Sequence, residues 1–223
     1  MKICILIPVY NEAETIGSLV RDLRARRFEV LVVDDGSSDH SGDIARKEGA
    51  VVLCHDRKMG KGVSLQKGFG CVLEGHYDVV IAMDGDGQHA VSDVEKFIRK
   101  AKEFPGSVIN GNRMDNPGEM PRVRFWTNRL MSSFISFICK QKIPDTQCGF
   151  RLISRNVLKE LKLTSCDFEI ETEVLIKTSR RGFRIHSVPI LTIYRNESSY
   201  INPFLDTIRF LKYIFKEAWT SKS

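Results

Sequence analysis

Five short apolar runs alternate with helical patterns in the first half of the chain, and this alternation limits the fold more than any other feature. The runs cover residues 3–7, 30–33, 51–54, 79–83 and 108–109, and each has the length and composition of a strand buried on both faces. Amphipathic helices are expected near 16–23, 41–49, 62–73 and 92–101, with Asn11 and Ser92 as N-caps of the first and last. The pattern predicts an α/β fold whose central sheet is mainly parallel and covered on both faces.

The second half has a different character after about Asn110. A heavily apolar helix is expected at 123–139, a second helix near 170–179, and a strand pair around 184–194. The segment 204–219 carries apolar residues on one helical face and basic residues elsewhere. We find no repeat or linker, so the 223 residues are interpreted as one domain.

Composition excludes several classes of protein. Hydrophobic residues make up 42% and charged residues 28%, as in soluble globular domains. The net charge of +6 suits nucleic acid, an anionic membrane surface or a phosphate-bearing substrate, and does not decide among them. The six cysteines form no CxxC pair, which favours reduced thiols over disulfides or zinc. No apolar run reaches a membrane span of roughly 18–20 residues, and Pro8 interrupts any signal-peptide core, so we expect a cytoplasmic body.

Polar, glycine-rich segments follow the expected strands. In open α/β sheets, ligands bind beyond the carboxyl ends of the strands, near the point where the strand order reverses. The segments 8–12, 34–39, 84–88 and 111–113 occupy these positions. We therefore expect them to form the site.

Asp84-Gly85-Asp86 follows the fourth apolar run. A turn at the glycine brings both carboxylates to one side, where they can hold one hard cation such as Mg²⁺ or Mn²⁺. Gln88 offers a neutral oxygen, and His89 can help to seat the loop. The alternative is a solvated turn, because Asp and Gly are common turn residues.

Two further motifs suit a nucleotide. Asp34-Asp35 follows the second run, where an acid commonly accepts hydrogen bonds from a ribose or a base. The alternative is a helix-capping turn. Gly60-Lys61-Gly62 opens a helix, and a helix N-terminus beside a lysine favours an anion. It lacks the spacing of a P-loop, and a basic helix cap is the alternative.

Taken together, seven ordered motifs resemble family-2 glycosyltransferases, and among them the polyprenol-phosphate (dolichol-phosphate) mannosyltransferases. Their spread over nearly the whole chain makes coincidence a poor explanation. They are IPVYNE at 7–12, VDDGSSD at 33–39, GKG at 60–62, MDGDGQH at 83–89, GNR at 111–113, DTQCGFR at 145–151, and NP at 202–203 with DT at 206–207 and RFL at 209–211.

The resemblance implies a GT-A fold, with residues 1–113 as the nucleotide-sugar half and 114–223 as the acceptor half. It places a Mg²⁺ or Mn²⁺ ion and the diphosphate among Asp84, Asp86 and Gln88, close to Lys61. By the same resemblance, the nucleoside pocket is lined by Pro8, Tyr10, Glu12 and Asp35.

Three arginines match family positions at the boundary of the two halves and in the acceptor half. Arg113 resembles an arginine that faces the sugar or a phosphate, while Arg124 and Arg195 resemble arginines that grip an acceptor phosphate. The family often has a Lys or His shortly after the last of these, near Ser199-Tyr200, and that cation is missing here.

The expected reaction is an inverting, metal-dependent transfer from a nucleotide sugar, GDP-mannose or a UDP-sugar, with Asp86 among the catalytic groups. A hydroxyl acceptor, for example in a cell-envelope glycan, needs a base, for which Asp145 is the best candidate. Asp145 is equally suited to anchoring a loop. A lipid phosphate is already anionic at neutral pH and needs arginines instead. The acceptor half offers Arg113, Arg122, Arg124, Arg151 and Arg195, which favours a polyprenyl phosphate.

A lipid acceptor predicts contact with a membrane. The 123–139 helix is interpreted as core rather than membrane-facing, and the 204–219 segment as an interfacial helix or one packed on a partner. The protein is then peripheral at the inner face of the membrane, with or without a separate membrane protein.

Two other classes were weighed. A nucleotidyltransferase would carry a glycine- and Lys/Arg-rich loop after the first strand, where this chain has Val9-Tyr10-Asn11-Glu12. A nucleic-acid-binding module would interleave its basic residues with aromatic ones, which this chain does not do. Both are less favoured than sugar transfer.

Overall fold

The computed structural model describes residues 1–193. Arg195, the 202–211 motif and the amphipathic segment at 204–219 therefore lie outside the described residues. The roles expected of them stay predictions.

A seven-stranded sheet forms the centre of the fold, in the order β3-β2-β1-β4-β6-β5-β7. All of its strands run parallel except β6, which lies antiparallel between β4 and β5. The order reverses between β1 and β4, which makes their carboxyl ends the switch point where α/β sheets bind ligands. The strands are β1 (Ile3–Val9), β2 (Glu29–Asp34), β3 (Val51–Cys54), β4 (Val79–Ala82), β5 (Val108–Asn112), β6 (Arg151–Ser154) and β7 (Ile185–Pro189).

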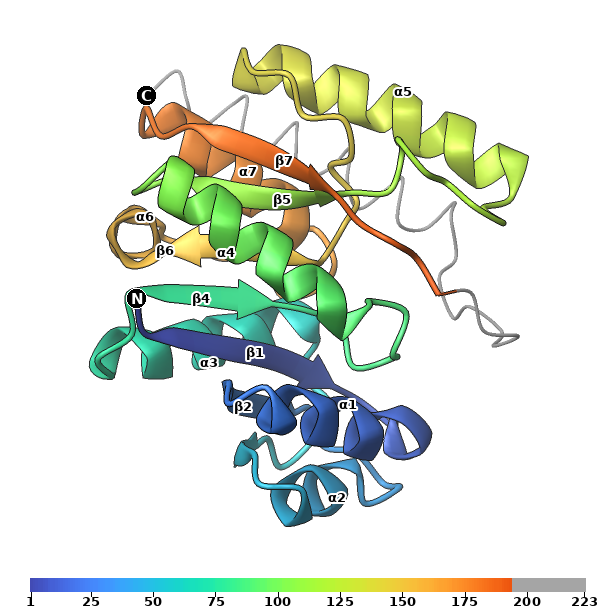
Figure 1. The fold of residues 1–223 in the computed structure, drawn as a ribbon, viewed down its shortest axis with the longest axis vertical. Helices are drawn as coiled ribbons and strands as arrows, with labels where there is room; N and C mark the ends of the chain where they lie inside the picture. Colours follow the sequence, from blue (N-terminus) through green and yellow to red (C-terminus); the bar gives the residue numbers. More distant parts are fainter. Residues whose placement is uncertain (194–223) are drawn as a thin grey trace.

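Helices cover both faces of the sheet, so the fold has three layers (Figure 1). One face packs against α1 (Ala13–Ala25), α2 (Ser41–Lys47) and α4 (Val94–Glu103). The other face packs against α3 (Lys61–Glu74), α5 (Arg122–Cys139), α6 (Arg155–Glu160) and α7 (Ile170–Arg180). The mainly parallel α/β fold and its five expected strands are confirmed.

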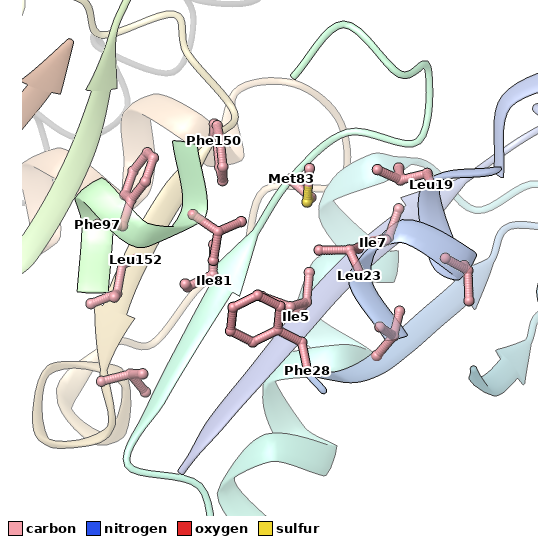
Figure 2. Close-up of a cluster of buried hydrophobic side chains, with 14 of the residues drawn as sticks. Ile5, Ile7, Leu19, Leu23, Phe28, Ile81, Met83, Phe97, Phe150 and Leu152 are labelled. Atoms are coloured by element: carbon pink, nitrogen blue, oxygen red, sulfur yellow. The ribbon is translucent and has the colours of Figure 1, made fainter. Parts of the chain in front are cut away.

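Strand β1 shows why the sheet needs two helical layers. Ile5 and Ile7 point into the core beneath α1 and α4, which Figure 2 shows in close-up. Cys4 and Leu6 point into the core on the opposite face. Because successive side chains of a strand alternate between faces, an unbroken apolar run buries both.

Both expected N-caps are wrong. Asn11 has a left-handed backbone (φ 57°), and its side-chain oxygen accepts a hydrogen bond from the Ser38 N–H at 2.9 Å. Helix α1 instead begins at Ala13, whose N–H donates to Asp39 Oδ2 at 2.9 Å. Ser92 lies inside a short 3-10 helix that precedes α4. In the first case a loop that is distant in sequence supplies the cap.

The expected strand pair at 184–194 is also wrong. Among the described residues 184–193, β7 is the one strand that forms; it runs parallel to β5, and its last residue is Pro189. Proline has no N–H with which to extend a ladder. The chain then crosses the strand ends, where Thr192 forms an isolated bridge with His89.

Helix α5 has apolar residues on both its inward and its outward side. Its buried residues are Asn128, Ser132, Ile135 and Cys139, and the Ser132 hydroxyl accepts a hydrogen bond from the Thr146 N–H at 2.9 Å. The interpretation of this helix as core is therefore wrong for its outer face. No helix between residues 1 and 193 is long and apolar enough to cross a membrane. The α5 outer face consists of Val123 (80% exposed), Trp126 (64%), Leu130 (72%), Phe134 (45%) and Phe137 (81%).

Candidate active site

The polar segments predicted to meet do so at one edge of the sheet. The ends of β1 and β2 lie side by side, with Val9 opposite Asp34. The antiparallel β6 enters at this edge, so Arg151 lies between Ala82 at the end of β4 and Asn110 of β5. The edge therefore gathers residues from both halves of the chain.

Asp35 is buried and organises the loop before α3. Its Oδ1 accepts from the Met59 N–H at 2.9 Å and its Oδ2 from the Gly60 N–H at 2.8 Å. The Nδ1 atom of His55 lies 2.8 Å from Oδ1. Asp35 thus fixes the Gly60-Lys61-Gly62 segment as well as lying at the expected nucleoside pocket. The capping alternative applies to its neighbour Asp34, whose Oδ1 accepts from the Ser37 N–H at 2.9 Å.

Lys61 joins the third helix to the DxD loop. Its ammonium lies 2.5 Å from Asp84 Oδ1 and 3.0 Å from Glu171 Oε1. Glu171 Oε2 in turn lies 3.3 Å from a guanidinium nitrogen of Arg151. Two cations and two carboxylates therefore alternate in the order Asp84, Lys61, Glu171, Arg151.

The ion pair keeps Asp84 and Lys61 charged. Burial alone would raise the pKa of Asp84, but the positive charges of Lys61 and Arg113 outweigh burial and lower its pKa to about 2. Burial alone would lower the pKa of Lys61, and the Asp84 and Glu171 carboxylates raise it instead. Asp84 is therefore a carboxylate over the whole physiological pH range.

Close packing holds the DxD loop against β1. A Cβ on Gly85 would lie 2.7 Å from the Val9 side chain and 3.5 Å from the Pro8 carbonyl. The Thr15 hydroxyl donates to the Gly85 carbonyl at 2.6 Å. Only glycine fits this contact, so the residue between the two aspartates is fixed by the β1 and α1 packing.

Asp86 and Gln88 share a turn that follows. Asp86 Oδ1 accepts from the Gln88 N–H at 2.9 Å, and Gly87 between them has a φ of 70°. Residues Asp86–Gln88 thus form a turn, as the alternative interpretation of the Asp84-Gly85-Asp86 motif expected. A turn is compatible with metal binding, so the assignment of a metal to these residues stays a prediction. Asp84, which precedes the turn, is bound by Lys61 instead.

The donor set fits a cation that is shared with a phosphate-bearing substrate. Among residues 1–193, no group of three or more His, Cys, Asp or Glu side chains is arranged to hold a metal. Mg²⁺ and Mn²⁺ usually take one or two carboxylates and complete their shell with phosphate oxygens and water. Asp84 and Asp86, one residue apart on a packed loop, provide that smaller set.

His89 seats the loop, as expected. It is buried, and its ring stacks on Phe150 with a centroid distance of 4.9 Å. Its Nδ1 accepts from the Asp84 N–H at 3.3 Å. Burial and the charges of Arg113 and Lys61 outweigh Asp84 and lower the pKa of His89 to about 4, so the ring is neutral at pH 7.

Arg113 and Asp145 were predicted as separate functional residues, and they are partners. The guanidinium is bidentate on the carboxylate, with Nε 2.7 Å from Oδ2 and Nη2 3.0 Å from Oδ1. Asp145 also accepts from the backbone N–H groups of Arg113 and Gln147. Of its two predicted roles, base or loop anchor, this geometry favours the anchor.

The remaining predicted residues differ in exposure. Tyr10 is 39% exposed beyond β1, with Lys58 Nζ 3.9 Å from its ring centroid. Glu12 is half-buried, and its N–H donates to the Ser41 hydroxyl at 2.8 Å. Arg124 is half-buried in the first turn of α5, and its side chain makes no hydrogen bond or ion pair with residues 1–193.

The structure corrects the argument from five arginines. Arg151 is 1% exposed and is bound by the Asn110 side chain, the Cys148 carbonyl and Glu171. Its guanidinium is thus held by groups of the protein itself, which favours a structural role. With Arg113 bound to Asp145, the number of arginines in the acceptor half is no longer an argument for phosphate.

Sequence reasoning missed Glu171 and His55. Glu171 lies within FEIETEV, where acids alternate with apolar residues at the start of a helix. That pattern is also typical of favourable charge at a helix N-terminus. Only the packing of α7 beside α3 reveals that Glu171 faces Lys61.

Comparisons with known proteins identify the family of the chain. The profile of glycosyl transferase family 2 matches residues 4–162, more than half of the 223-residue chain. The chain belongs to glycosyl transferase family 2. The family match includes Asp35, Lys61, the DxD loop and the Arg113–Asp145 pair, while Glu171 lies beyond it.

Relatives cover most of this family-2 glycosyltransferase. Glycosyltransferase AglJ of Haloferax volcanii is 34% identical over 219 residues, which is 97% of this chain and 71% of the relative. The UDP-N-acetylglucosamine–dolichyl-phosphate N-acetylglucosaminyltransferase of Methanococcus voltae is 30% identical over 220 residues, which is 88% of this chain and 87% of the relative. The resemblance to transferases that use polyprenol phosphates is confirmed.

A solved structure shares the fold. Glucosyl-3-phosphoglycerate synthase from Mycobacterium tuberculosis, crystallised with Mn²⁺, uridine diphosphate and phosphoglyceric acid, superposes with a TM-score of 0.70 at 20% identity. The match covers 88% of this chain and 72% of the synthase. The GT-A fold expected for the chain is confirmed.

Proposed function

We propose that this glycosyltransferase moves a sugar from GDP-mannose or a UDP-sugar to a polyprenyl phosphate, with inversion and with Mg²⁺ or Mn²⁺. The main support for a nucleotide-sugar donor is the position of the DxD loop, at the switch point between β1 and β4. It lies between the Asp35-organised loop, which suits a nucleoside, and Arg113, which suits the sugar or a phosphate. The crystallised synthase is complexed with Mn²⁺ and uridine diphosphate, which supports a metal and a nucleotide here.

The leaving diphosphate sets the role of each group in this proposal. The metal, when bound, neutralises charge that grows on the leaving group. Asp84 and Asp86 hold that metal, with Gln88 beside them. Lys61 adds a second positive charge next to Asp84, and Asp145 keeps the Arg113 guanidinium oriented toward the same place.

The burial and hydrogen bonding of Asp145 favour a phosphate acceptor over a hydroxyl acceptor. A base must offer a lone pair to the acceptor hydroxyl within hydrogen-bond reach. The Asp145 carboxylate is fully buried and already accepts hydrogen bonds from Arg113 and Gln147. A lipid phosphate is already an anionic nucleophile and needs no such base. The name of the M. voltae relative, which includes dolichyl phosphate, supports the same class of acceptor.

The α5 outer face is suited to binding a membrane surface. The helix contains Arg122, Arg124 and Arg129 and no acidic residue. Apolar side chains flanked by arginines suit a surface of anionic lipids, where the arginines meet the headgroups. Two copies joined through this face would bring like charges together. We therefore propose a peripheral position on the inner leaflet, with the α5 outer face toward the lipid.

A transfer assay tests the proposal. The purified full chain is incubated with GDP-mannose, UDP-glucose or UDP-N-acetylglucosamine, and with Mn²⁺, Mg²⁺ or a chelator. The acceptors are a polyprenyl phosphate and the matching polyprenol, which carries a hydroxyl. We expect one nucleotide sugar to glycosylate the phosphate only, and the chelator to abolish the product. Transfer to the polyprenol instead would establish the hydroxyl-acceptor alternative.

Asp86→Asn tests the metal assignment. The change removes a charged oxygen ligand and keeps the size of the side chain. We expect product formation to fall by about a hundredfold or more. An Asp86→Asn enzyme with full activity and unchanged metal dependence would contradict the assignment.

A further inference from the structure

Lys61 and Glu171 form a charge arrangement that the catalytic roles above leave unexplained. The Lys61 ammonium lies between two carboxylates, 2.5 Å from Asp84 Oδ1 and 3.0 Å from Glu171 Oε1. The three side chains are 15%, 30% and 12% exposed respectively. One of the two carboxylates that would hold a cation therefore already has a cationic partner.

The protein leaves Lys61 little room to move away. A Cβ on Gly149 would lie 3.0 Å from the Lys61 ammonium and 2.8 Å from Asp84 Oδ2, so the Gly149 backbone lies directly beside the pair. The Phe168 ring lies on another side, with its centroid 5.7 Å from the ammonium. A cation arriving at Asp84 must therefore share the site with the ammonium.

Glu171 is equally fixed. Arg151 Nη1 lies 3.3 Å from Glu171 Oε2 and donates to the Glu171 carbonyl at 2.9 Å. Helix α7 thus presents Glu171 to Lys61 in one orientation, and the four charges Asp84, Lys61, Glu171 and Arg151 sum to zero. A divalent cation alone upsets this balance, because it adds positive charge beside the Lys61 ammonium. A cation that arrives with a nucleoside diphosphate restores it, because the phosphate oxygens offer Lys61 new acceptors.

We propose that Lys61, positioned by Glu171, makes metal binding at the DxD loop depend on the nucleoside diphosphate. This inference rests on the proposed function, because it assumes that Asp84 and Asp86 hold the metal. Bare metal binds weakly, the metal–diphosphate complex binds tightly, and Lys61 increases the coupling beyond that of the metal–phosphate bonds alone. By linkage, the metal raises the affinity for the nucleotide by the same factor.

Mn²⁺ titration followed by electron paramagnetic resonance tests the coupling without any turnover. Free Mn²⁺ is measured against the full chain alone and in the presence of GDP or UDP. For the wild type, we expect the better nucleotide to raise the Mn²⁺ affinity by about tenfold or more. For Lys61→Met, we expect tighter binding of Mn²⁺ alone and a coupling at least about threefold weaker than in the wild type, because direct metal–phosphate bonds remain.

Glu171→Gln should change the affinity for Mn²⁺ alone in the opposite direction from Lys61→Met. Removing this negative charge leaves Lys61 with Asp84 as its one carboxylate partner, so Mn²⁺ alone binds more weakly than to the wild type. A role limited to supporting the fold would change both variants in the same direction. Lys67→Met is the matched control, since Lys67 is an exposed lysine of the same helix and donates to the Cys54 carbonyl. Its Mn²⁺ binding stays at the wild-type value.

The outcomes separate this inference from the proposed function. If the wild type binds no Mn²⁺ with either nucleotide, the metal part of the proposed function fails. If the wild type shows the coupling and Lys61→Met retains it, the inference about Lys61 fails alone. If circular dichroism shows that Lys61→Met does not fold, Lys61→Gln is used in its place. Glu171→Gln is an independent test, because it should weaken the binding of Mn²⁺ alone whereas the Lys61 variants strengthen it.

Discussion

Arg113 and Asp145 form a buried, bidentate ion pair, with Nε 2.7 Å from Oδ2 and Nη2 3.0 Å from Oδ1. Arg113 directly follows β5, and Asp145 lies in the loop that leads to β6. The pair therefore fixes the position of a guanidinium at the site by means of a loop from the acceptor half. The neighbouring Thr146 N–H donates to Ser132, which ties the same loop to α5.

Asp145→Ala should lower stability and sugar transfer together. Removing one partner of a buried ion pair leaves the other charge uncompensated and costs about 3–5 kcal/mol. We expect the free energy of unfolding in urea to fall by that amount, and transfer to fall because Arg113 loses its orientation.

The double variant Arg113→Leu with Asp145→Leu is the control for this ion pair. It removes both charges, so it should recover part of the lost stability without recovering transfer. A catalytic base would give a different result. In that case Asp145→Ala would lower transfer far more than Arg113→Leu, although both variants break the same ion pair.

Gly149→Ala should impair the site with little change elsewhere. The new Cβ would lie 2.8 Å from Asp84 Oδ2 and 3.0 Å from Lys61, so the ion pair must shift. A displacement of this kind costs about a hundredfold in rate. We expect that loss in the transfer assay.

Gly70→Ala is the matched control for Gly149→Ala. Gly70 lies within α3, and a Cβ there meets no atom within 4 Å. Because alanine favours a helix, this change should stabilise the protein by about 0.5–1 kcal/mol and leave transfer unchanged. Full activity in Gly149→Ala would show that the close approach is unimportant.

Glu173 should contribute to loss of stability in acid. Its carboxylate accepts from the Ser165 N–H at 2.8 Å and lies 2.6 Å from Lys177 Nζ. Burial alone would raise the pKa of Glu173, but these hydrogen bonds outweigh burial and lower it below the ordinary 4.5. A depressed pKa gives stability that is present above about pH 4.5 and is lost as the pH falls through the lowered value.

Urea unfolding at pH 7, 5 and 3.5 measures this effect. We expect the wild type to lose stability between the last two conditions, and Glu173→Gln to be less stable at pH 7 with a shallower acid loss. Glu14→Gln, at an exposed glutamate of α1, should follow the wild type. Parallel pH curves for wild type and Glu173→Gln would contradict the prediction.

The α5 outer face should bind anionic vesicles. Replacing Trp126, Leu130 and Phe137 by serine removes apolar area that would enter the lipid, at about 1.5–3 kcal/mol for each large side chain. We expect flotation with phosphatidylglycerol vesicles to show at least a tenfold loss of partitioning, a conservative figure for that area. Val51→Ser, at a residue 63% exposed on β3, should not change binding. Undiminished binding by the triple variant would place the membrane contact elsewhere.

The sequence alone predicted the layered sheet well. The apolar runs of β1, β2, β4 and β5 indicate strands covered on both faces, and these strands are buried; the edge strand β3 was expected to be buried too, and its ends are exposed. Each strand is followed by polar residues, which located Asp35, the DxD loop and Arg113 at one edge. These predictions succeed because strand burial and strand exits are local properties of the chain.

Local patterns could not predict contacts between distant segments. Asn11 has the composition of an N-cap, yet Asp39 from the next loop binds the first N–H of α1. The 123–139 helix has the composition of a core helix, yet five of its large apolar residues face outward, while Ser132 is buried and bonds to the loop of Asp145. In both cases the arrangement includes a hydrogen bond to a segment outside the helix.

The sequence by itself determined the first five strands, the mainly parallel α/β class and the polar segments that follow the strands. Only the tertiary structure decided which charges are partners: Arg113 with Asp145, Lys61 with Asp84 and Glu171, and Arg151 with Glu171. The physical reason is that an ion pair depends on distances of a few ångströms between side chains from separate elements. Such distances are set by how α7 and β6 pack against the sheet, and residue type and spacing along the chain do not encode them.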